Sequence, residues 1–258
     1  MRVFSLFCLV ALFFSCKQNQ EEESNNVTID SIVQQNNETS TLDTIDSKKV
    51  VPKIDTLEQQ IIDAGLIDIQ SVDSTIKIDL RYTTKNNFMK MDLYGGLNKI
   101  YLQKEVAERL SKAQSSLKRK DSNLTLLVYD GVRPRLVQQK MWDALDTIPF
   151  NERIKFVSNP KNGSLHNYGC AVDLTIMNLK TGEVLDMGAG YDDLRKIAYP
   201  KHEAAFLESG ELSKEQFKNR KLLRSAMKKG GFWVLSTEWW HFNAFTREKA
   251  KELYDIVE

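Results

Sequence analysis

Two of the three histidines in this sequence stand close to carboxylates. His166 precedes Asp173 in the segment GSLHNYGCAVDLT, and His241 follows Glu238 in the segment TEWWHF. Two imidazoles and one aspartate suit a catalytic zinc ion that keeps its fourth position for water, whose pKa it can lower to about 7. Hydrolysis then needs a base beside that water, and Glu238 is the candidate because it lies outside the ligand set.

The spacing of Glu238 and His241 carries a structural requirement. In a fully extended strand these side chains would face opposite sides, so we predict a bend or irregular turn at Trp239 and Trp240. Both tryptophans are by default core aromatics, and we expect them also to wall the site. A single histidine is more often a structural hydrogen-bonding residue, whereas a carboxylate inside an apolar strand such as AVDLT is costly unless a cation accompanies it.

The remaining histidine and a nearby cysteine carry weaker signals. His202 has no partner at a ligand spacing, so we expect a residue of a loop or of a helix start. Cys170 begins the predicted strand that carries Asp173, and strand alternation places it on the opposite face, as a small buried residue rather than a nucleophile. Three cysteines cannot form a disulfide framework.

The elements that must position these residues are of both kinds. Apolar runs of strand length predict strands, and apolar residues at helical spacing, with a capping box at Ser213 and Gln216, predict helices. Because the two do not alternate strictly, we predict an α+β fold with a mostly antiparallel central sheet flanked by helices. The predicted strands cover residues 75–82, 124–129, 170–177 (returning through 183–185) and 232–235, and the predicted helices cover residues 57–64, 99–119, 135–145, 213–229 and 246–257.

Several segments together resemble the zinc D-alanyl-D-alanine peptidases, and among these the VanX-type D-Ala-D-Ala dipeptidases. The pattern S-x-H-x-x-G-x-A-x-D followed by E-x-x-H is typical of the wider group. Four further segments narrow the likeness: IDLRYTTKNNF resembles the signature DLRYAT.NNF, YDGVRP resembles WDGYRP, MGAGYD resembles MG..FD, and STEWWH resembles SLEWWH. The departures, Val132, Tyr191 and Thr237, remove neither a ligand nor the base. The likeness covers most of the predicted domain.

The resemblance implies the zinc D-Ala-D-Ala peptidase (Hedgehog-like) fold with one Zn²⁺ per subunit. It implies that His166, Asp173 and His241 are the zinc ligands and that Glu238 is the general base. Arg133 would stabilise the oxyanion of the tetrahedral intermediate, a role that suits a permanently charged, fork-shaped guanidinium. The alternative for Arg133 is a structural salt bridge in a turn.

Three further positions match those that the family uses near the ammonium end of the substrate, namely Ser164, Asp192 and Tyr82. Asp192 has the clearest physical reason, because the free α-amino group of a dipeptide needs an anion nearby. Asp192 could instead cap a helix that begins at Asp193, and Ser164 could be a turn residue beside Gly163.

The implied function is zinc-dependent hydrolysis of the D-alanyl-D-alanine dipeptide to D-alanine, in cell-wall turnover or remodelling. A D,D- or L,D-carboxypeptidase that trims peptidoglycan stem peptides uses the same chemistry and stays open. A non-catalytic peptidoglycan-binding lipoprotein also stays open, although it would have no need of a base beside its metal. The expected partner is a small D-amino-acid dipeptide as substrate, and no obligate protein partner is implied.

The first residues are typical of an export signal. Residues 1–16 combine a positive start, an apolar run too short to span a bilayer, and Cys16 in a loose lipobox, which predicts a lipid anchor. The alternatives are an ordinary secretory signal or an uncleaved anchor, with Cys16 incidental. Residues 17–56 are polar and acidic and predict a disordered tether, and residues 57–258 form the predicted zinc dipeptidase domain.

We therefore expect a lipid-anchored protein of the bacterial cell envelope that faces the periplasm or the surface. Lys+Arg 36 against Asp+Glu 35 gives a formal net charge of +1, which argues against a nucleic-acid partner and against a polybasic membrane-binding surface. The membrane contact that we expect is the lipid anchor only.

Overall fold

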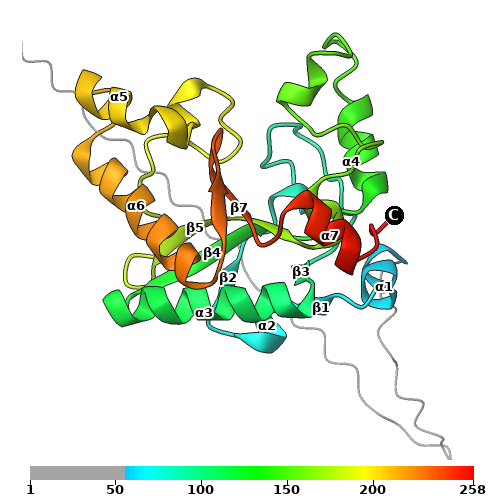
Figure 1. The fold of residues 1–258 in the computed structure, drawn as a ribbon, viewed down its shortest axis with the longest axis horizontal. Helices are drawn as coiled ribbons and strands as arrows, with labels where there is room; N and C mark the ends of the chain where they lie inside the picture. Colours follow the sequence, from blue (N-terminus) through cyan, green and yellow to red (C-terminus); the bar gives the residue numbers. More distant parts are fainter. Residues whose placement is uncertain (1–55) are drawn as a thin grey trace, which may run out of the picture. The chain divides into compact units, whose positions relative to one another are not determined.

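The structure is a computed structural model that describes residues 56–258 (Figure 1). The predicted signal of residues 1–16, its lipidation site Cys16 and all but the last residue of the predicted tether lie outside the described residues. Thr56 already belongs to a helix, so helical structure begins one residue before the predicted domain boundary. Within the described chain no helix combines the length and the apolar character that a membrane span needs.

A five-stranded sheet, in the order β2-β4-β5-β7-β6, carries the fold. Only β2 and β4 pair in parallel, and all other neighbours are antiparallel, which confirms the predicted sheet. A separate antiparallel pair joins β1 to β3. The strands are β1 (Ile67–Asp68), β2 (Lys77–Ile78), β3 (Tyr101–Leu102), β4 (Leu124–Asp130), β5 (Ala171–Asn178), β6 (Trp233–Leu235) and β7 (Glu238–Asn243).

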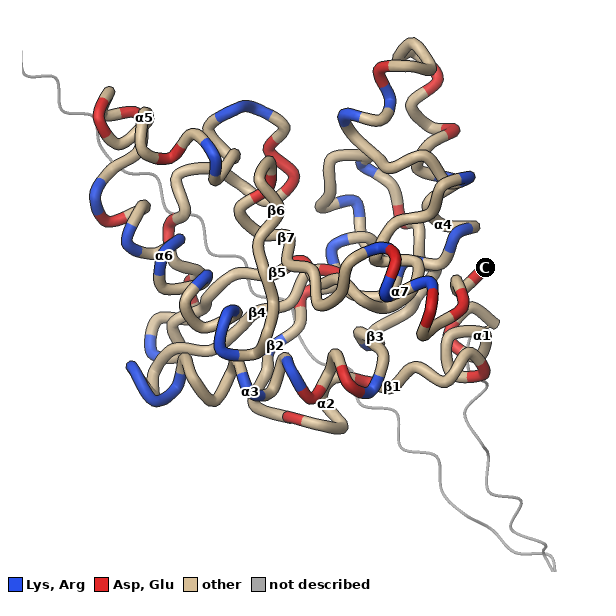
Figure 2. Tube along the Cα trace, in the orientation of Figure 1, with Lys and Arg blue, Asp and Glu red and all other residues tan. Residues whose placement is uncertain are grey.

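The long helices cover this sheet. Helix α3 packs against β4, and α6 packs against α3 (Figure 1). Lysines and arginines recur along these two helices, with acidic residues between them (Figure 2). The helices are α1 (Thr56–Asp63), α2 (Ile69–Val72), α3 (Lys104–Lys120), α4 (Arg135–Asp143), α5 (Glu203–Ser209), α6 (Lys214–Lys229) and α7 (Arg247–Leu253), with 3₁₀ turns at Arg81–Thr83, Arg153–Lys155, Leu165–Tyr168, Lys196–Ala198 and Pro200–His202.

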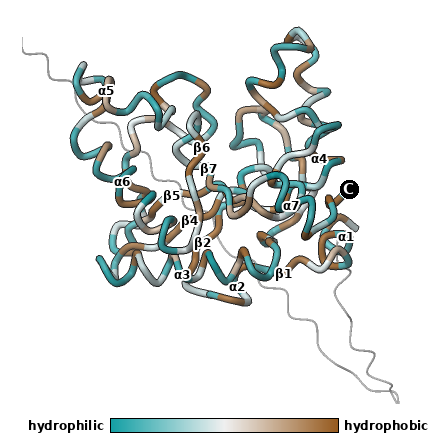
Figure 3. The backbone as a smooth tube through the Cα atoms, in the orientation of Figure 1, coloured by the Kyte–Doolittle hydropathy of each residue, from teal (hydrophilic) through white to brown (hydrophobic). Residues whose placement is uncertain are grey.

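The core forms because the two inner strands are apolar runs. All of β4 and the first six residues of β5 are buried, as expected of strands that are covered on both faces. Helix α3 adds Val106, Leu110, Ala113 and Leu117, whose spacing places them on one buried face of the helix. Figure 3 shows hydrophobic residues gathered in the central strands and hydrophilic residues recurring along the helices.

The predicted ends of α6 are confirmed. The Ser213 hydroxyl accepts a hydrogen bond from Gln216 N (3.1 Å), and the Gln216 side chain accepts one from Ser213 N (2.8 Å). This reciprocal pair satisfies two N–H groups at the start of the helix, which therefore begins at Lys214. Gly230 follows the last helical residue, as predicted.

The predicted strand over residues 75–82 is mostly wrong. Only Lys77–Ile78 pairs with β4, and Arg81–Thr83 forms a 3₁₀ turn. The carbonyl of Tyr82 accepts a hydrogen bond from Leu93 N (2.8 Å). The backbone at Tyr82 therefore bonds to a later segment of the chain and not to a neighbouring strand.

Three predicted helices are shorter than expected, and two short helices, α2 and α5, were not predicted. The predicted helix over residues 135–145 ends at Asp143. The predicted helix over residues 99–119 loses its first turn to β3. The predicted helix over residues 246–257 ends at Leu253, and Val257 N instead donates to Asn167 O (2.9 Å). Helix α5 is only seven residues long, and its short apolar pattern gave no signal against the surrounding turns.

Candidate active site

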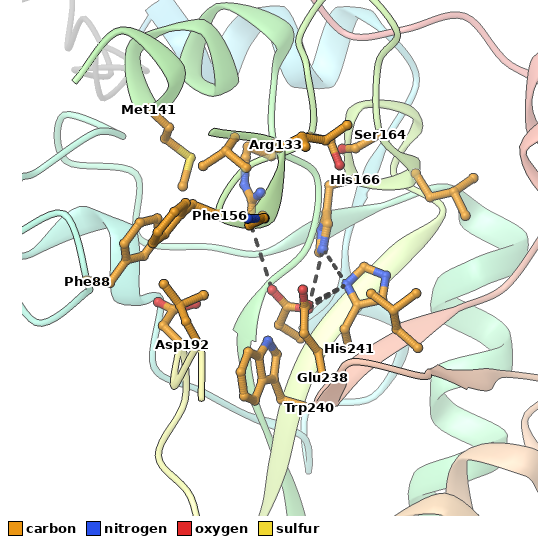
Figure 4. A pocket seen from close by; sticks show the side chains of 18 of the residues that line it. Phe88, Arg133, Met141, Phe156, Ser164, His166, Asp192, Glu238, Trp240 and His241 are labelled. Atoms are coloured by element: carbon orange, nitrogen blue, oxygen red, sulfur yellow. Dashed lines mark hydrogen bonds and ion pairs between the residues drawn. The ribbon is translucent and has the colours of Figure 1, made fainter. Parts of the chain in front are cut away.

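The register of the sheet brings two of the predicted ligands together. Asp173 on β5 pairs with His241 on β7. Neighbouring strands lie about 4.8 Å apart, so paired side chains on one face of the sheet meet. Figure 4 shows the side chain of His166 pointing towards those of Glu238 and His241, which both belong to β7.

Glu238 reaches this point because β7 is irregular. Val234 pairs with Phe242, but the next residue, Leu235, pairs with Glu238, where a regular antiparallel ladder would pair it with His241. The irregular stretch turns Glu238 towards the face that carries His241, and Glu238 Oε2 lies 3.9 Å from His241 Nδ1. The predicted irregularity between these two residues is confirmed.

A short 3₁₀ turn delivers His166. Arg133 N donates to His166 O (3.0 Å), and Asn167 Nδ2 donates to Arg133 O (2.6 Å), so the turn is bonded to the segment that follows β4. The turn ends at Gly169, whose φ of +64° lies in the left-handed region and where an added Cβ would meet Leu66 Cδ2 at 2.6 Å. Glycine adopts this conformation without strain and leaves room for the leucine.

The three predicted ligand atoms fit a tetrahedral zinc ion. His166 Nε2 lies 3.1 Å from His241 Nδ1, and Asp173 Oδ1 lies 3.0 Å from His241 Nδ1 and 3.4 Å from His166 Nε2. Ligand atoms about 2.0–2.1 Å from zinc stand about 3.3–3.4 Å apart at the corners of a tetrahedron. The side chains, which form a cluster able to hold a metal ion, thus supply three of the four corners.

Each imidazole has its second nitrogen held by an acceptor. His166 Nδ1 lies 2.7 Å from Gly131 O, and His241 Nε2 lies 2.8 Å from Asn243 Oδ1. With a metal bound, a proton on each of these outer nitrogens would leave the other nitrogen of each ring unprotonated and facing the cluster. Gly131 has to be glycine, because an added Cβ would meet Tyr101 O at 2.8 Å.

The cluster perturbs its own ionisable groups. Burial disfavours the charged form of Asp173, but the charge of His166 and hydrogen bonds from both histidines hold the pKa of the Asp173 carboxyl well below its usual range. Burial also opposes the charged form of His241, yet the hydrogen bond to Asp173 and its charge raise the His241 pKa to about 9. A group of ligands that attracts a proton this strongly also suits a divalent cation in the proton's place.

Glu238 stands beside the cluster without joining it. Burial raises the pKa of its carboxyl, and the charge of His241 acts in the opposite direction. The side chain is still 35% exposed, so water can reach it. A carboxylate with a raised pKa beside the fourth corner has the properties of a general base.

Arg133 makes the salt bridge that the sequence offered as its alternative role and also faces the cluster. Its Nε and Nη2 donate to Asp130 Oδ2 at 3.0 and 2.6 Å, and Nη2 lies 3.8 Å from Asp173 Oδ2. Asp130 in turn accepts hydrogen bonds from the Tyr94 hydroxyl (2.7 Å) and from Gly131 N (3.1 Å). The buried salt bridge therefore holds a cation at the wall of the cavity.

Asp192 and Tyr82 meet at another part of the cavity, with Asp192 away from His241 in Figure 4. The Tyr82 hydroxyl donates to Asp192 Oδ2 (3.1 Å). Asp192 has a φ of +61°, a left-handed conformation that aspartate adopts more readily than most other non-glycine residues. Burial, and then the charge of Asp173, raise the pKa of Asp192 to about 8. The helix-cap alternative is wrong, because the chain directly after Asp192 is not helical.

Ser164 has contacts of a different kind. Its hydroxyl donates to Gln138 Oε1 (2.9 Å), which also accepts from Asn167 Nδ2 (2.9 Å). Its backbone N donates to Asn167 Oδ1 (2.6 Å). Ser164 lines the cavity, and these bonds place it in the turn that carries His166, in agreement with the turn-residue alternative.

A cavity of about 210 Å³ is lined by all of the predicted metal-binding, catalytic and substrate-binding residues. Trp240 lines it, as predicted, whereas Trp239 is buried outside the lining and donates to Ala189 O (3.1 Å). Apolar residues line much of the remaining wall, together with the cations Lys155 and Arg247; the apolar residues include Phe88, Met141, Ile154, Phe156, Leu165 and Leu194. The cavity is thus a small chamber with a metal-binding cluster, a fixed guanidinium and a separate carboxyl.

Cys170 and His202 lie outside the cavity lining, as predicted. Cys170 is fully buried, and burial raises the pKa of its thiol to about 12, so it stays protonated and unreactive. His202 ends a 3₁₀ turn and stacks on Tyr199 with ring centroids 6.0 Å apart.

Sequence reasoning missed three residues that support the site, Asp130, Gln138 and Asn243. An acid at the end of an apolar strand, shortly before Arg133, was a usable signal for Asp130. Asn243 follows His241 by two positions and so shares its strand face, which was also a usable signal. Gln138 offered none, since its role depends on how α4 packs on a distant turn.

A mostly antiparallel α+β sheet that presents two histidines and an aspartate to one point, with a glutamate beside the fourth corner, defines a metallopeptidase. The chain belongs to the M15 peptidase family, because the family model described as D-ala-D-ala dipeptidase matches residues 62–256. This membership confirms the predicted fold family and enzyme class.

Curated relatives support the same assignment. The D-alanyl-D-alanine dipeptidase of Escherichia coli K12 is 30% identical over 177 residues, which cover 69% of this chain and 83% of the relative. The D-alanyl-D-alanine dipeptidase of Enterococcus faecium is 29% identical over 194 residues, 70% of this chain and 92% of the relative. That of Streptomyces coelicolor is 32% identical over 186 residues, 66% of this chain and 86% of the relative.

Proposed function

We propose that this protein hydrolyses D-alanyl-D-alanine to D-alanine, with zinc as its metal, in cell-wall turnover or remodelling. The observation that carries the proposal is one small cavity that holds the metal-binding cluster, Glu238 and the separate carboxyl of Asp192. The names of the relatives support the substrate, since all three are D-alanyl-D-alanine dipeptidases.

The chemical step needs a proton acceptor and a proton donor. When bound by His166, Asp173 and His241, zinc supplies Lewis-acid polarisation of the scissile carbonyl and lowers the pKa of water towards about 7. Glu238 takes a proton from the attacking water and delivers one to the leaving amine. Its raised pKa suits both transfers, because a carboxyl that is too acidic would hold the proton too weakly to return it.

Arg133 stabilises the negative charge that develops on the carbonyl oxygen. The salt bridge with Asp130 fixes the guanidinium before the substrate arrives, so little reorganisation is needed during the reaction. Burial opposes the charged guanidinium, but the carboxylate of Asp130 favours it, and the pKa of Arg133 lies well above its usual value. The group therefore keeps its charge.

Asp192 selects a substrate with a free amino terminus. Its carboxyl lies partly buried beside the Tyr82 hydroxyl, and an ammonium group placed there would favour the charged carboxylate. A longer peptide brings an amide instead of an ammonium to this end of the cavity, and so leaves the carboxyl without a cation. The pairing therefore favours a dipeptide over a stem peptide.

A comparison of three substrates tests this proposal. The zinc-loaded full chain is assayed for D-alanine release from D-Ala-D-Ala, from its N-acetyl derivative and from a stem pentapeptide that ends in D-Ala-D-Ala. We expect release from the free dipeptide alone, lost on chelation and restored by zinc. Release from the pentapeptide alone would identify a carboxypeptidase, and no release from any substrate by a fully zinc-loaded protein would identify a binding module.

We also propose that a lipid on Cys16 anchors the protein in the bacterial envelope, facing the periplasm or the surface. The support is the layout of residues 1–16. Cells are grown with labelled palmitate, and we expect the wild-type protein to carry label in the membrane fraction and the Cys16→Ser variant to carry none. Equal labelling of both proteins would contradict the assignment.

A further inference from the structure

The two oxygens of the Asp173 carboxylate face different partners. Oδ1 lies within 3.0 Å of His241 Nδ1 and 3.4 Å of His166 Nε2, inside the metal-binding cluster. Oδ2 points away from the cluster and accepts a hydrogen bond from the hydroxyl of Tyr191 (3.1 Å). The second neighbour of Oδ2 is Arg133 Nη2, at the longer distance of 3.8 Å. Tyr191 therefore supplies the closest hydrogen-bond donor to Asp173 Oδ2, the carboxylate oxygen outside the metal-binding cluster.

The ring of Tyr191 has little freedom to move. Its centroid lies 4.8 Å from that of Tyr129 on β4, 5.6 Å from that of Trp240 on β7 and 6.4 Å from that of Tyr82 in the 3₁₀ turn. Rings from three separate elements thus hold one phenol, in the edge-on and tilted arrangements that aromatic groups prefer. The hydroxyl is placed against Asp173 by packing and not only by its own hydrogen bond.

We propose that Tyr191 is a positioning residue that restrains the Asp173 carboxylate so that only Oδ1 faces the metal, and that this restraint sets the affinity of the site for zinc. The inference rests on the proposed metal site but not on the identity of the substrate. Side chains that hydrogen-bond a metal-ligating carboxylate fix its orientation, and their loss typically lowers metal affinity or activity about 10- to 100-fold.

The position of Tyr191 in the chain links the metal-binding cluster to the amine end of the cavity. Tyr191 contacts the metal-binding cluster, and the next residue, Asp192, faces Tyr82 at the other part of the cavity. One backbone segment therefore joins the group that orients a ligand to the group that we assign to the substrate ammonium. Without the Tyr191 hydroxyl, the carboxylate of Asp173 is free to rotate about its terminal torsion and bring Oδ2 towards Arg133 or the cluster.

The test is the zinc dissociation constant of Tyr191→Phe, measured on the full chain by competition with a fluorescent chelator. The substitution keeps the ring and its packing and removes only the hydroxyl, so the variant should fold. We expect the dissociation constant to rise about tenfold. At saturating zinc, the KM for D-Ala-D-Ala should stay within about twofold of wild type, since the amine end is untouched.

Tyr129→Phe is the matched control. It removes a hydroxyl from the neighbouring ring of the same aromatic group, a ring whose face is covered by the Arg81 guanidinium at 4.5 Å from the centroid. We expect zinc affinity of this control to equal that of wild type. An unchanged dissociation constant in Tyr191→Phe, or an equal loss in both variants, would overturn the proposal. If the wild-type protein binds zinc but leaves D-Ala-D-Ala intact, the proposed dipeptidase function is wrong. The comparison of zinc affinities between the two variants still tests the role of Tyr191 in that case.

Discussion

The metal-binding cluster and the amine end of the cavity are built on different kinds of backbone. Asp173 and His241 stand on adjacent strands whose ladder fixes their pairing. Asp192 lies in an irregular segment with a φ of +61°, and Tyr82 lies in a 3₁₀ turn. Asp173, His241 and Glu238 are thus held by the sheet, and His166 by a turn that is hydrogen-bonded to the segment after β4. The groups that we assign to substrate selection are held by side-chain contacts.

This difference separates two functions of the cavity. Groups that must stay within a few tenths of an ångström of a productive geometry are best placed on strands or helices. Loops positioned by such a scaffold can change without disturbing it, and they are where binding specificity commonly resides. We therefore expect changes around the cluster to abolish turnover, and changes at the amine end to alter which substrate is used.

The largest effect is expected for Glu238→Gln, which removes the proposed general base from β7. The amide cannot accept the water's proton, so kcat should fall about 10²- to 10⁴-fold, while the zinc content and KM stay near wild type. Steady-state kinetics and metal analysis measure this, with the exposed Glu215→Gln on α6 as control. Near-normal turnover of Glu238→Gln would show that another group acts as the base.

The next effect is expected at the amine end, from Asp192→Asn. Asparagine tolerates the left-handed backbone and can still accept from the Tyr82 hydroxyl, so the fold should persist. Loss of the charge should lower kcat/KM for D-Ala-D-Ala about 10- to 100-fold, mainly through KM, since hydrogen bonds to charged groups contribute about 1.5–3 kcal/mol. The control is Asp193→Asn, whose carboxyl pairs with Arg195. A loss confined to kcat would contradict the assignment of Asp192 to substrate binding and of the metal-binding cluster to the chemical step.

A structural substitution sharpens the same comparison. In Gly131→Ala the added Cβ would meet the backbone oxygen of Tyr101 at 2.8 Å. The free energy of unfolding of the protein should therefore fall by about 1–3 kcal/mol. The carbonyl that holds His166 should shift as well, and zinc affinity should fall with stability. Urea denaturation measures the first change. Gly190→Ala, where an added Cβ meets nothing within 4 Å, is the control, and equal losses would contradict the argument.

The smallest effect is expected in the pH dependence of the metal-free protein. The folded-state pKa of His241 is about 9, above its ordinary value of 6.5, because of its hydrogen bond to Asp173 and that group's charge. This stabilisation is fully present below pH 6.5 and is lost as the pH rises through about 9. Denaturation in chelator at several pH values should show a decline between these limits that is weaker in His241→Asn. A decline of equal slope in that variant would exclude His241 as its source.

Local signals in the sequence determined the chemistry and the central elements. The residue types at His166, Asp173, Glu238 and His241 suggested a metal-assisted hydrolysis, because they suit a tetrahedral zinc ion and a base. The resemblance of the surrounding motifs to the zinc D-alanyl-D-alanine peptidases is what implied a role for each residue. The inner strands β4 and β5 were predictable as apolar runs of strand length. The start of α6 was predictable as well, since a capping box acts within a single turn.

Only the tertiary structure decided how these residues are held. Nothing local indicates that Gln138 bonds the turn that carries His166, that Tyr191 donates to Asp173, or that the chain after residue 78 leaves the sheet to form a turn. These features depend on strand register and on packing between segments far apart in the chain. A pattern read along the sequence carries the preferences of each segment, and the contacts between segments arise only when the whole core closes.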